Sequence, residues 1–284
     1  MSGSIRVFAT RDRVRRFAAS PNAILGLALF VLLLLMALFA PLLAPTDPVA
    51  VNVADRLQPP SAAHWFGTDD LGRDIYSRVI WGSRLAVRLG VLSVAVAATG
   101  GVLLGLIAGY YGGWVDQLIS RLLEIVLAFP ELLFAIAIIA ILGPSLDNLI
   151  VAFGLFGWPG YARIVRGSVL SARRREYVEA ARAIGARGRR IMFRHILPNV
   201  IAPVIILSAT RFGGALLAGS GLSFIGLGVP IPQPEWGAIM ATGREYYQRA
   251  LWITVFPGAL ITLAVLGVNL LGDGLRDVLD PRSR

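Results

Sequence analysis

Long apolar runs separated by short polar segments make up most of the chain. A bilayer core of roughly 30 Å takes about 20 apolar residues of helix per crossing, and runs near this length recur. They fall at 23–44, 85–109, 122–142, 149–164, 199–218 and 250–271. Because a lipid-embedded segment must satisfy its backbone polar groups internally, we expect each run to be a helix. The pattern predicts an all-α polytopic membrane protein with about six transmembrane helices.

The first and fourth runs are less typical of membrane helices. A basic start before an apolar stretch is also the pattern of a signal peptide, but the run at 23–44 is too long for one and no small-residue cleavage site follows it. The run at 149–164 is short and is interrupted by glycines and by Pro159. Such interruptions are tolerated where freed backbone groups face protein or water, so we expect this span inside the bundle.

The segment between the first two runs, 45–84, is polar and rich in proline. Leu71, Ile75 and Val79 recur there at helical spacing, directly after Thr68 and Asp69. We therefore predict a short amphipathic helix capped near one of these two residues.

Composition supports the membrane interpretation and excludes several functions. The 284 residues are 56% hydrophobic and 15% charged, with a mean hydropathy of +0.70. There is no cysteine, which excludes disulfides and thiolate metal sites. All 27 basic residues are arginine, so the lysine-bearing phosphate loop of P-loop ATPases cannot occur. His64 and His195 have no ligand partners at metal spacing, so we expect neither a metal nor a cofactor in this chain.

The net charge of +10 follows membrane topology and does not indicate a nucleic-acid partner. Most arginines fall in four segments that alternate with the outward-facing ones: 1–22, 110–121, 163–194 and 276–284. By the positive-inside rule these segments are cytoplasmic. We expect a multi-pass protein of the cytoplasmic (inner) membrane, surrounded by lipid, with both termini in the cytoplasm.

The longest inside loop, at about 163–197, predicts a helix, a glycine turn and a second helix. Apolar residues recur at spacings of three and four on an otherwise charged stretch: Tyr177, Val178, Ala181 and Ile184. Gly185 ends this first helix, a second begins at about Arg189, and Pro198 starts the next span. From these features alone, the loop helix could equally lie on anionic lipid headgroups.

Four stretches of sequence resemble one family. Glu179, Ala180, Ala181 and Gly185, followed by Leu197 and Pro198, resemble the EAA loop of binding-protein-dependent ABC importers, with His195 at an isoleucine position as the one departure. Residues 67–84, 222–237 and 269–281 resemble other elements of the dipeptide/oligopeptide/nickel permeases. The resemblance covers the chain from about residue 20 onward and is strongest to the second, C-type, permease subunit.

The resemblance implies the transmembrane domain of a type I ABC importer. Residues 1–84 would hold the cytoplasmic N-terminus, the first membrane helix and an extracytoplasmic segment, 85–274 the permease domain, and 275–284 a cytoplasmic tail. The chain would be the pore-forming subunit of a di- or oligopeptide importer and not itself an enzyme. Its expected partners are a homologous permease forming a heterodimer, two ABC ATPase subunits or one fused protein that bind ATP and magnesium, and an extracytoplasmic substrate-binding protein.

The resemblance also implies roles for the loop residues. Glu179 would be the polar anchor of the ATPase contact, Ala180 and Ala181 would permit close packing, and Gly185 would make the turn. Leu197 and Pro198 complete the motif.

Charged residues elsewhere suggest two further sites. Arg211 lies within the fifth span and Glu131 within the third, and intramembrane charges are candidates for the translocation pathway. Snorkelling or a structural pair explains Arg211 as well. Asp69, Asp70, Arg73 and Asp74 cluster before the second span and are candidates for an outer gate or a receptor contact. The alternative there is local, because Asp74 and Arg78 are four residues apart and can pair along a helix.

Other functions fit the sequence less well. The same architecture could import nickel or another non-peptide ligand, because these motifs mark scaffold and coupling. A stand-alone channel or proton-coupled carrier would show several membrane acids and an inverted repeat. A membrane enzyme would show a cluster of acids, histidines or metal ligands in the spans. Neither pattern is found in the sequence.

Overall fold

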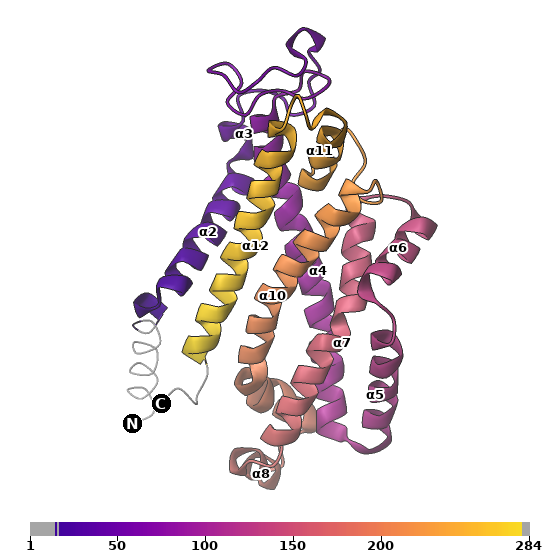
Figure 1. Cartoon of the computed structure of the whole chain (residues 1–284). Helices are drawn as coiled ribbons and strands as arrows, with labels where there is room; N and C mark the ends of the chain where they lie inside the picture. The colour runs from indigo at the N-terminus through magenta and orange to yellow at the C-terminus, as the bar shows by residue number, and fades with distance from the viewer. Residues whose placement is uncertain (1–14, 16, 280–284) are drawn as a thin grey trace.

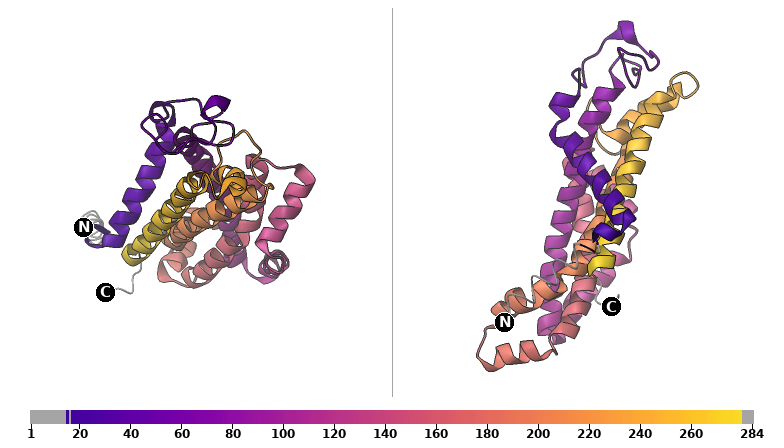
Figure 2. Two further views of the ribbon diagram at one scale, coloured as in Figure 1. Left: turned by 45° about the horizontal axis from the view of Figure 1, so that its top comes forward. Right: turned by 90° about the vertical axis from the view of Figure 1, so that its left-hand side faces the viewer.

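Five long helices run side by side along the molecule (Figures 1 and 2). They are α2 (Pro21–Leu38), α4 (Ile75–Tyr111), α7 (Leu146–Ala172), α10 (Leu197–Phe224) and α12 (Trp252–Leu279). The computed structural model describes residue 15 and residues 17–279. The N-terminal arginines Arg6, Arg11, Arg13 and Arg16, and positions 280–284 of the predicted tail, lie outside the described residues.

The helices account for the predicted membrane crossings. Within the described residues, α2, α4, α12 and the helical stretch Gly188–Phe224 are long and apolar enough to span a membrane. A fifth crossing is the pair α5 (Gly113–Leu127) and α6 (Glu131–Leu142), which is bent by 82°. α7 has 27 residues, which is enough to cross, but a more polar composition. These six units correspond to the six apolar runs.

The third predicted span is two helices and not one. α5 ends at Leu127, and α6 begins at Glu131 after Pro130, which adopts an extended conformation. Proline has no amide hydrogen to donate and disfavours helix in the residue before it, so a break at this point is expected. Figure 1 shows α5 and α6 lying end to end along α7 with the break between them.

The short helix predicted after Thr68 does not form. Asp74 is the N-cap of α4, and its carboxylate accepts the amide of Ser77 at 2.8 Å. From there α4 continues unbroken for 37 residues into the membrane span. Gly67 and Gly72 both have φ of +73°, a conformation open to glycine, and they turn the preceding loop away from helical geometry.

The fourth span lies inside the bundle, as its interrupted sequence predicts. α7 buries residues along its whole length, including Phe153, Tyr161 and Val169. Gly101 and Gly105 of α4 lie directly against this helix, and side chains there would collide with it. Small residues allow two membrane helices to approach closely, so α4 and α7 form the centre of the fold.

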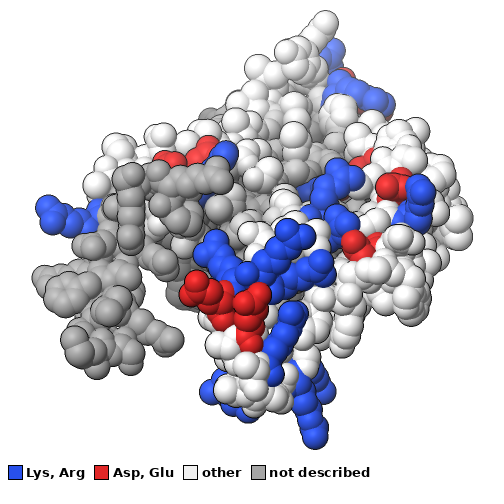
Figure 3. Space-filling model, turned by 90° about the horizontal axis from the view of Figure 1, so that it is seen from below, with Lys and Arg blue, Asp and Glu red and all other residues white. Residues whose placement is uncertain are grey.

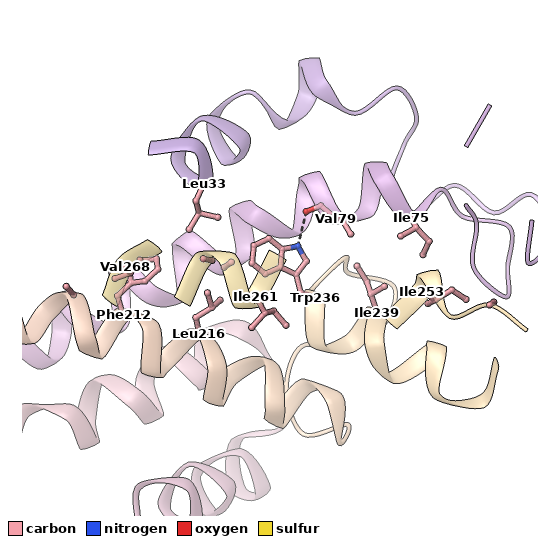
Figure 4. Close-up of a cluster of buried hydrophobic side chains, with 14 residues drawn as sticks. Leu33, Ile75, Val79, Phe212, Leu216, Trp236, Ile239, Ile253, Ile261 and Val268 are labelled. Carbon is pink, nitrogen blue, oxygen red and sulfur yellow. Dashed lines mark hydrogen bonds between the residues drawn. The ribbon is translucent and has the colours of Figure 1, made fainter. Parts of the chain in front are cut away.

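A second core lies where the short helix α11 (Trp236–Gly243) meets α4, α10 and α12 (Figure 4). The buried indole of Trp236 donates from Nε1 to the carbonyl oxygen of Val79 at 2.9 Å. Phe212 and Leu216 of α10 and Val268 of α12 belong to the same cluster. The hydrogen bond satisfies the one polar atom of the tryptophan side chain inside an apolar core.

The two ends of the molecule differ. α8 (Glu176–Ala183) lies at the end where α2 begins and α12 finishes, which we call the α8 end (Figure 1). The loop at 45–74 and the helix α11 lie at the opposite end, which we call the α11 end. The start of α2, the end of α12 and the predicted coupling loop therefore share one end of the bundle.

α2 packs on α12 through small residues. A Cβ on Gly26 of α2 would collide with the backbone of Leu270 and Leu271, and one on Gly274 of α12 would collide with Ala23. Because lipid offers no hydrophobic drive to bring helices together, such close van der Waals packing holds the pair.

We expect Gly274→Val to displace α2 and to lower the stability of the purified protein by about 1–3 kcal/mol, the usual cost of overpacking. The measurement is the thermal unfolding midpoint in detergent. The matched control is Gly214→Val on α10, where a Cβ would meet nothing within 4 Å among the described residues. Equal midpoints for the two variants would contradict the packing argument.

Candidate functional site

The predicted coupling loop forms a short helix with a glycine end. α8 spans Glu176–Ala183, and Gly185 follows with φ of +78°. The amide of Ala186 donates to the carbonyl of Ala181 at 3.0 Å, and that of Gly185 donates to Arg182 at 2.9 Å. This pair of bonds is the Schellman ending, which satisfies the last carbonyls of a helix. Gly185 therefore ends the helix as the sequence predicts.

The apolar stripe of α8 divides between two faces. Val178 and Ala181 are buried and pack with residues of α7, η2 and α10. Tyr177 and Ile184 instead lie on the surface, with exposed fractions of 37% and 85%. Glu179 and Ala180 are exposed as well. One face of α8 thus holds it to its own chain, and an opposite face carries apolar and acidic side chains outward.

Contacts with α4 fix α8 on the bundle. The guanidinium of Arg182 lies over the ring of Tyr110 at 5.6 Å from the centroid, a cation–π arrangement. After Gly185 the chain continues through α9 (Gly188–Arg190) and the π-helix η2 (Ile191–Ile196) into α10. Leu197 and Pro198 are the first residues of α10, where the missing amide of proline is tolerated. α8 is therefore joined to the bundle on both sides by helical elements.

The α8 end is basic. Seen from this end, blue arginine side chains predominate over red acidic ones (Figure 3). Arg187, Arg189 and Arg190 line a hollow beside Phe193, and all three are exposed. The acidic face of α8 lies within these basic surroundings.

Arg211 and Glu131 form an ion pair within the membrane spans. Nη1 of Arg211, near the middle of α10, donates to Oε2 of Glu131 at 2.9 Å. Glu131 is the first residue of α6, at the break of the bent span. The two residues proposed for the pathway therefore meet, although the sequence separates them by 80 positions. Pairing offsets the cost of each charge in hydrocarbon.

A small cavity adjoins this ion pair. It is lined from four helices, by Ser93 of α4, Glu131 of α6, Phe153 and Gly157 of α7, and Arg211 of α10, among others. The hydroxyl oxygen of Ser93 is buried and has no hydrogen-bond partner among the described residues. A polar atom left unpaired in a dry interior is costly, so this cavity is suited to a polar guest such as water.

Buried charges hold together the loop at the α11 end. Asp69 is fully buried, and its Oδ2 accepts Nε of Arg73 at 2.7 Å. Nε of Arg78 lies 3.7 Å from the same oxygen. Nη1 of Arg78 donates to the carbonyl oxygens of Pro48 and Pro232, at 2.8 and 3.5 Å. The buried arginines thereby join two loops and the start of α4.

The predicted pairing of Asp74 with Arg78 is not formed. Oδ2 of Asp74 caps α4 through the amide of Ser77, and Oδ1 contacts Nδ1 of His64 at 3.0 Å. Asp74 is held by these two partners, and Arg78 lies against Asp69 instead. Asp70 is the more exposed acid of the group, with its side chain 27% exposed.

Two polar contacts have no local signal in the sequence. Asp116 of α5 binds Arg166 of α7 through two bonds, one of them 2.7 Å from Nη2 to Oδ2, across 50 positions. At the α11 end, buried Glu235 caps α11, accepting the amide of Ala238 and the hydroxyl of Ser220, each at 2.8 Å. Burial raises the pKa of the Glu235 carboxyl above its ordinary value, against the lowering effect of these bonds.

Comparison with known proteins defines the class of this membrane protein. The family model described as "binding-protein-dependent transport system inner membrane component" matches residues 101–284, and that of the "N-terminal TM domain of oligopeptide transport permease C" matches 9–60. The chain belongs to the first family, the inner-membrane permease components of binding-protein-dependent ABC importers. The second match places it with the C-type permeases, which confirms the resemblance seen from about residue 20 onward.

Individual relatives extend over almost the whole chain. The dipeptide transport system permease protein DppC of Alkalihalophilus pseudofirmus is 48% identical, over 96% of this chain and 90% of the relative. The glutathione transport system permease protein GsiD of Pectobacterium atrosepticum is 44% identical, over 96% and 91%. Among solved structures, a chain of the MetNI methionine ABC transporter matches with a TM-score of 0.58 and 18% identity, over 72% of this chain and 97% of that chain. The fold is that of an ABC importer transmembrane domain.

We expect Asp69→Asn to destabilise the protein strongly, because it removes the buried carboxylate that both Arg73 and Arg78 face and leaves only Asp70, 3.8 Å from Arg73, as a nearby acid. Breaking a buried ion pair from one side costs about 3–5 kcal/mol. The measurement is the thermal unfolding midpoint in detergent, with Asp70→Asn, at a more exposed acid of the same cluster, as the control. A midpoint for Asp69→Asn no lower than that of the control would show that this cluster does not stabilise the loop.

Proposed function

We propose that this chain is the pore-forming permease subunit of an ABC importer that carries di- and oligopeptides across the cytoplasmic membrane. The observation that carries the proposal is α8, a rigidly capped helix at one end of a membrane bundle, in a chain of this permease family. Relatives at 43–48% identity are named for dipeptide, di/tripeptide, glutathione and other peptide transport, which supports peptides as the cargo.

Energy for import must come from another protein. The chain has no lysine and hence no P-loop, so ATP and magnesium would bind to two ABC ATPase subunits, or to one fused protein. The exposed face of α8, with Tyr177, Glu179 and Ile184, suits a groove on such a subunit because it offers apolar area beside a charge. Glu179 and Ala180 would contact the ATPase directly, while Ala181, Gly185, Leu197 and Pro198 would hold the loop in shape.

The remaining partners follow from the same proposal. A homologous second permease would complete the pore as a heterodimer, and an extracytoplasmic substrate-binding protein would deliver the peptide. The α8 end would face the cytoplasm, because most arginines lie in segments on that side. The α11 end would then face outward. There the buried cluster of Asp69, Arg73 and Asp74 would shape the outer gate, and the partly exposed Asp70 would be the member able to meet the receptor.

The proposed function predicts the neighbouring genes and the transported ligand. We expect adjacent reading frames to encode a second permease, one or two P-loop ATPases and a substrate-binding protein. The complex of these products, reconstituted in liposomes, should import labelled dialanine when ATP is supplied. Import of nickel without import of dialanine would overturn the peptide assignment. Transport by this chain alone, without ATP, would overturn the importer class.

We expect Glu179→Arg and Gly185→Leu to leave membrane insertion intact and to uncouple uptake from ATP hydrolysis. Among the described residues, no atom lies within 4 Å of a Cβ at Gly185, so the effect there comes from the positive φ, and Gly185→Asn should be milder. The measurements are dialanine uptake and ATPase turnover by the reconstituted complex.

The matched control for the charge reversal is Glu245→Arg in the short helix η3 (Arg244–Tyr246), which follows α11. Glu245 is exposed and lies outside the membrane spans. Uptake by this variant should remain close to that of the unmodified complex. Unchanged uptake in both loop variants would refute a coupling role for α8.

A further inference from the structure

The ion pair between Arg211 and Glu131 lies on a surface that lipid cannot cover. The side chains are 31% and 41% exposed, and residues 128–130 at the break of the bent span are exposed beside them. Charges and non-helical backbone at membrane depth are tolerated only against protein or water. This surface must therefore face the partner permease or a water-filled pathway.

Two of the three guanidinium nitrogens of Arg211 have no hydrogen-bond acceptor among the described residues. Its only hydrogen bond to the described residues runs from Nη1 to Glu131, which leaves Nε and Nη2 without an acceptor there. Nη2 lies beside Gly160 of α7, where a Cβ would approach to 3.1 Å. Glycine at this position leaves room for the guanidinium. A guanidinium presents a fork of donors that fits a carboxylate, and one edge of this fork is unused.

If Arg211 moves away from Glu131, the N-terminus of α6 still stabilises the Glu131 carboxylate. Glu131 is the first residue of α6, whose N-cap Pro130 makes no side-chain capping bond. The positive end of the helix dipole therefore stabilises the Glu131 carboxylate. When Arg211 moves from Glu131 to another carboxylate, Arg211 keeps a counter-charge, and Glu131 is left with the N-terminus of α6 as its stabilising neighbour.

Polar groups continue from this pair along α10. Ser208, one turn before Arg211, accepts the hydroxyl of Tyr161 at 3.2 Å. On the other side, the cavity beside Arg211 contains the unpartnered hydroxyl of Ser93. Polar groups of α4, α7 and α10 therefore lie near Arg211 in the bundle.

We propose that Arg211 binds the C-terminal carboxylate of the passing peptide, and that Glu131 holds Arg211 in place when no peptide is present. This inference rests on the proposed function and names the chemical group that the pathway recognises. No covalent step is involved, since one ion pair is exchanged for another. A peptide with its C-terminus amidated would lack the group that competes with Glu131.

Chemical labelling tests the binding directly and needs no receptor. The whole importer complex in lipid nanodiscs, with ATP and magnesium, is treated with phenylglyoxal, and modification of each arginine is read by mass spectrometry. Dialanine should slow the labelling of Arg211 in proportion to its concentration, and alanylalaninamide should not. Because dialanine has no side-chain carboxylate, protection would identify the C-terminal one. Arg88, exposed and paired with Asp147, is the control and should label equally in all samples.

Failure of this labelling pattern would overturn the inference. If Arg88 is modified and Arg211 is not, Arg211 is closed to water and lies against the partner. Equal protection by dialanine and its amide would mean that the carboxylate is not recognised.

Uptake by two variants distinguishes peptide binding by Arg211 from a purely structural ion pair between Arg211 and Glu131. Arg211→Gln should lower dialanine uptake about tenfold, the effect of losing one charge-assisted contact. Glu131→Gln, which removes the competing carboxylate, should retain uptake or raise it. A merely structural pair would give equal losses in both variants, and that result would refute the inference. Arg88→Gln serves as the matched surface control.

The reference measurement distinguishes this inference from the function on which it rests. If the unmodified complex with its receptor fails to import dialanine, the proposed function is wrong. If it imports dialanine and the two variants lose uptake equally, only the assignment of Arg211 fails.

Discussion

Hydrocarbon offers no hydrogen bonds, and the rest of this structure depends on that constraint. Every polar group in a span must find a partner within the protein or in water. α7 meets the constraint by lying inside the bundle, where Gly154, Gly157 and Gly160 lie against neighbouring helices and Pro159 is buried. Charged residues meet it by pairing across helices, as Asp116 does with Arg166 and Glu131 with Arg211. The order of helices in the bundle follows from these pairings and from close glycine contacts.

The helices could be located from sequence because crossing a bilayer requires a fixed length of apolar chain. The break in the third span was not predicted, although Pro130 stands at its position, and its angle of 82° depends on contacts with α7 that the sequence does not reveal. The start of α4 was misplaced for a different reason. Helical spacing of Leu71, Ile75 and Val79 suggested a helix, but the positive φ of Gly67 and Gly72 ends that pattern.

In the candidate sites too, local features could be predicted from the sequence, and features that depend on distant contacts could not. The helix α8 and its Gly185 ending are local features, so the sequence predicted them and the structure confirms the helix and the turn. The split of its apolar stripe depends on which face meets α7 and α10, which spacing alone does not determine. At the α11 end, a pairing rule for isolated helices predicted Asp74 with Arg78, and it failed because Asp74 caps the helix. Asp116 and Arg166 are separated by 50 positions and had no signal at all.

The helices α7 and α10 connect the proposed ATPase contact at α8 with the proposed peptide-binding site at Arg211. Both helices adjoin the coupling loop, because α7 leads into α8 and α10 follows η2. The same two helices meet again at the ion pair, where Gly160 of α7 lies beside the guanidinium of Arg211. A shift of α8 would therefore be passed on by two packed helices to the place where the break in the third span exposes Glu131. Energetic coupling needs such a contiguous element with two arrangements, and exchange of the carboxylate at Arg211 would supply the second arrangement.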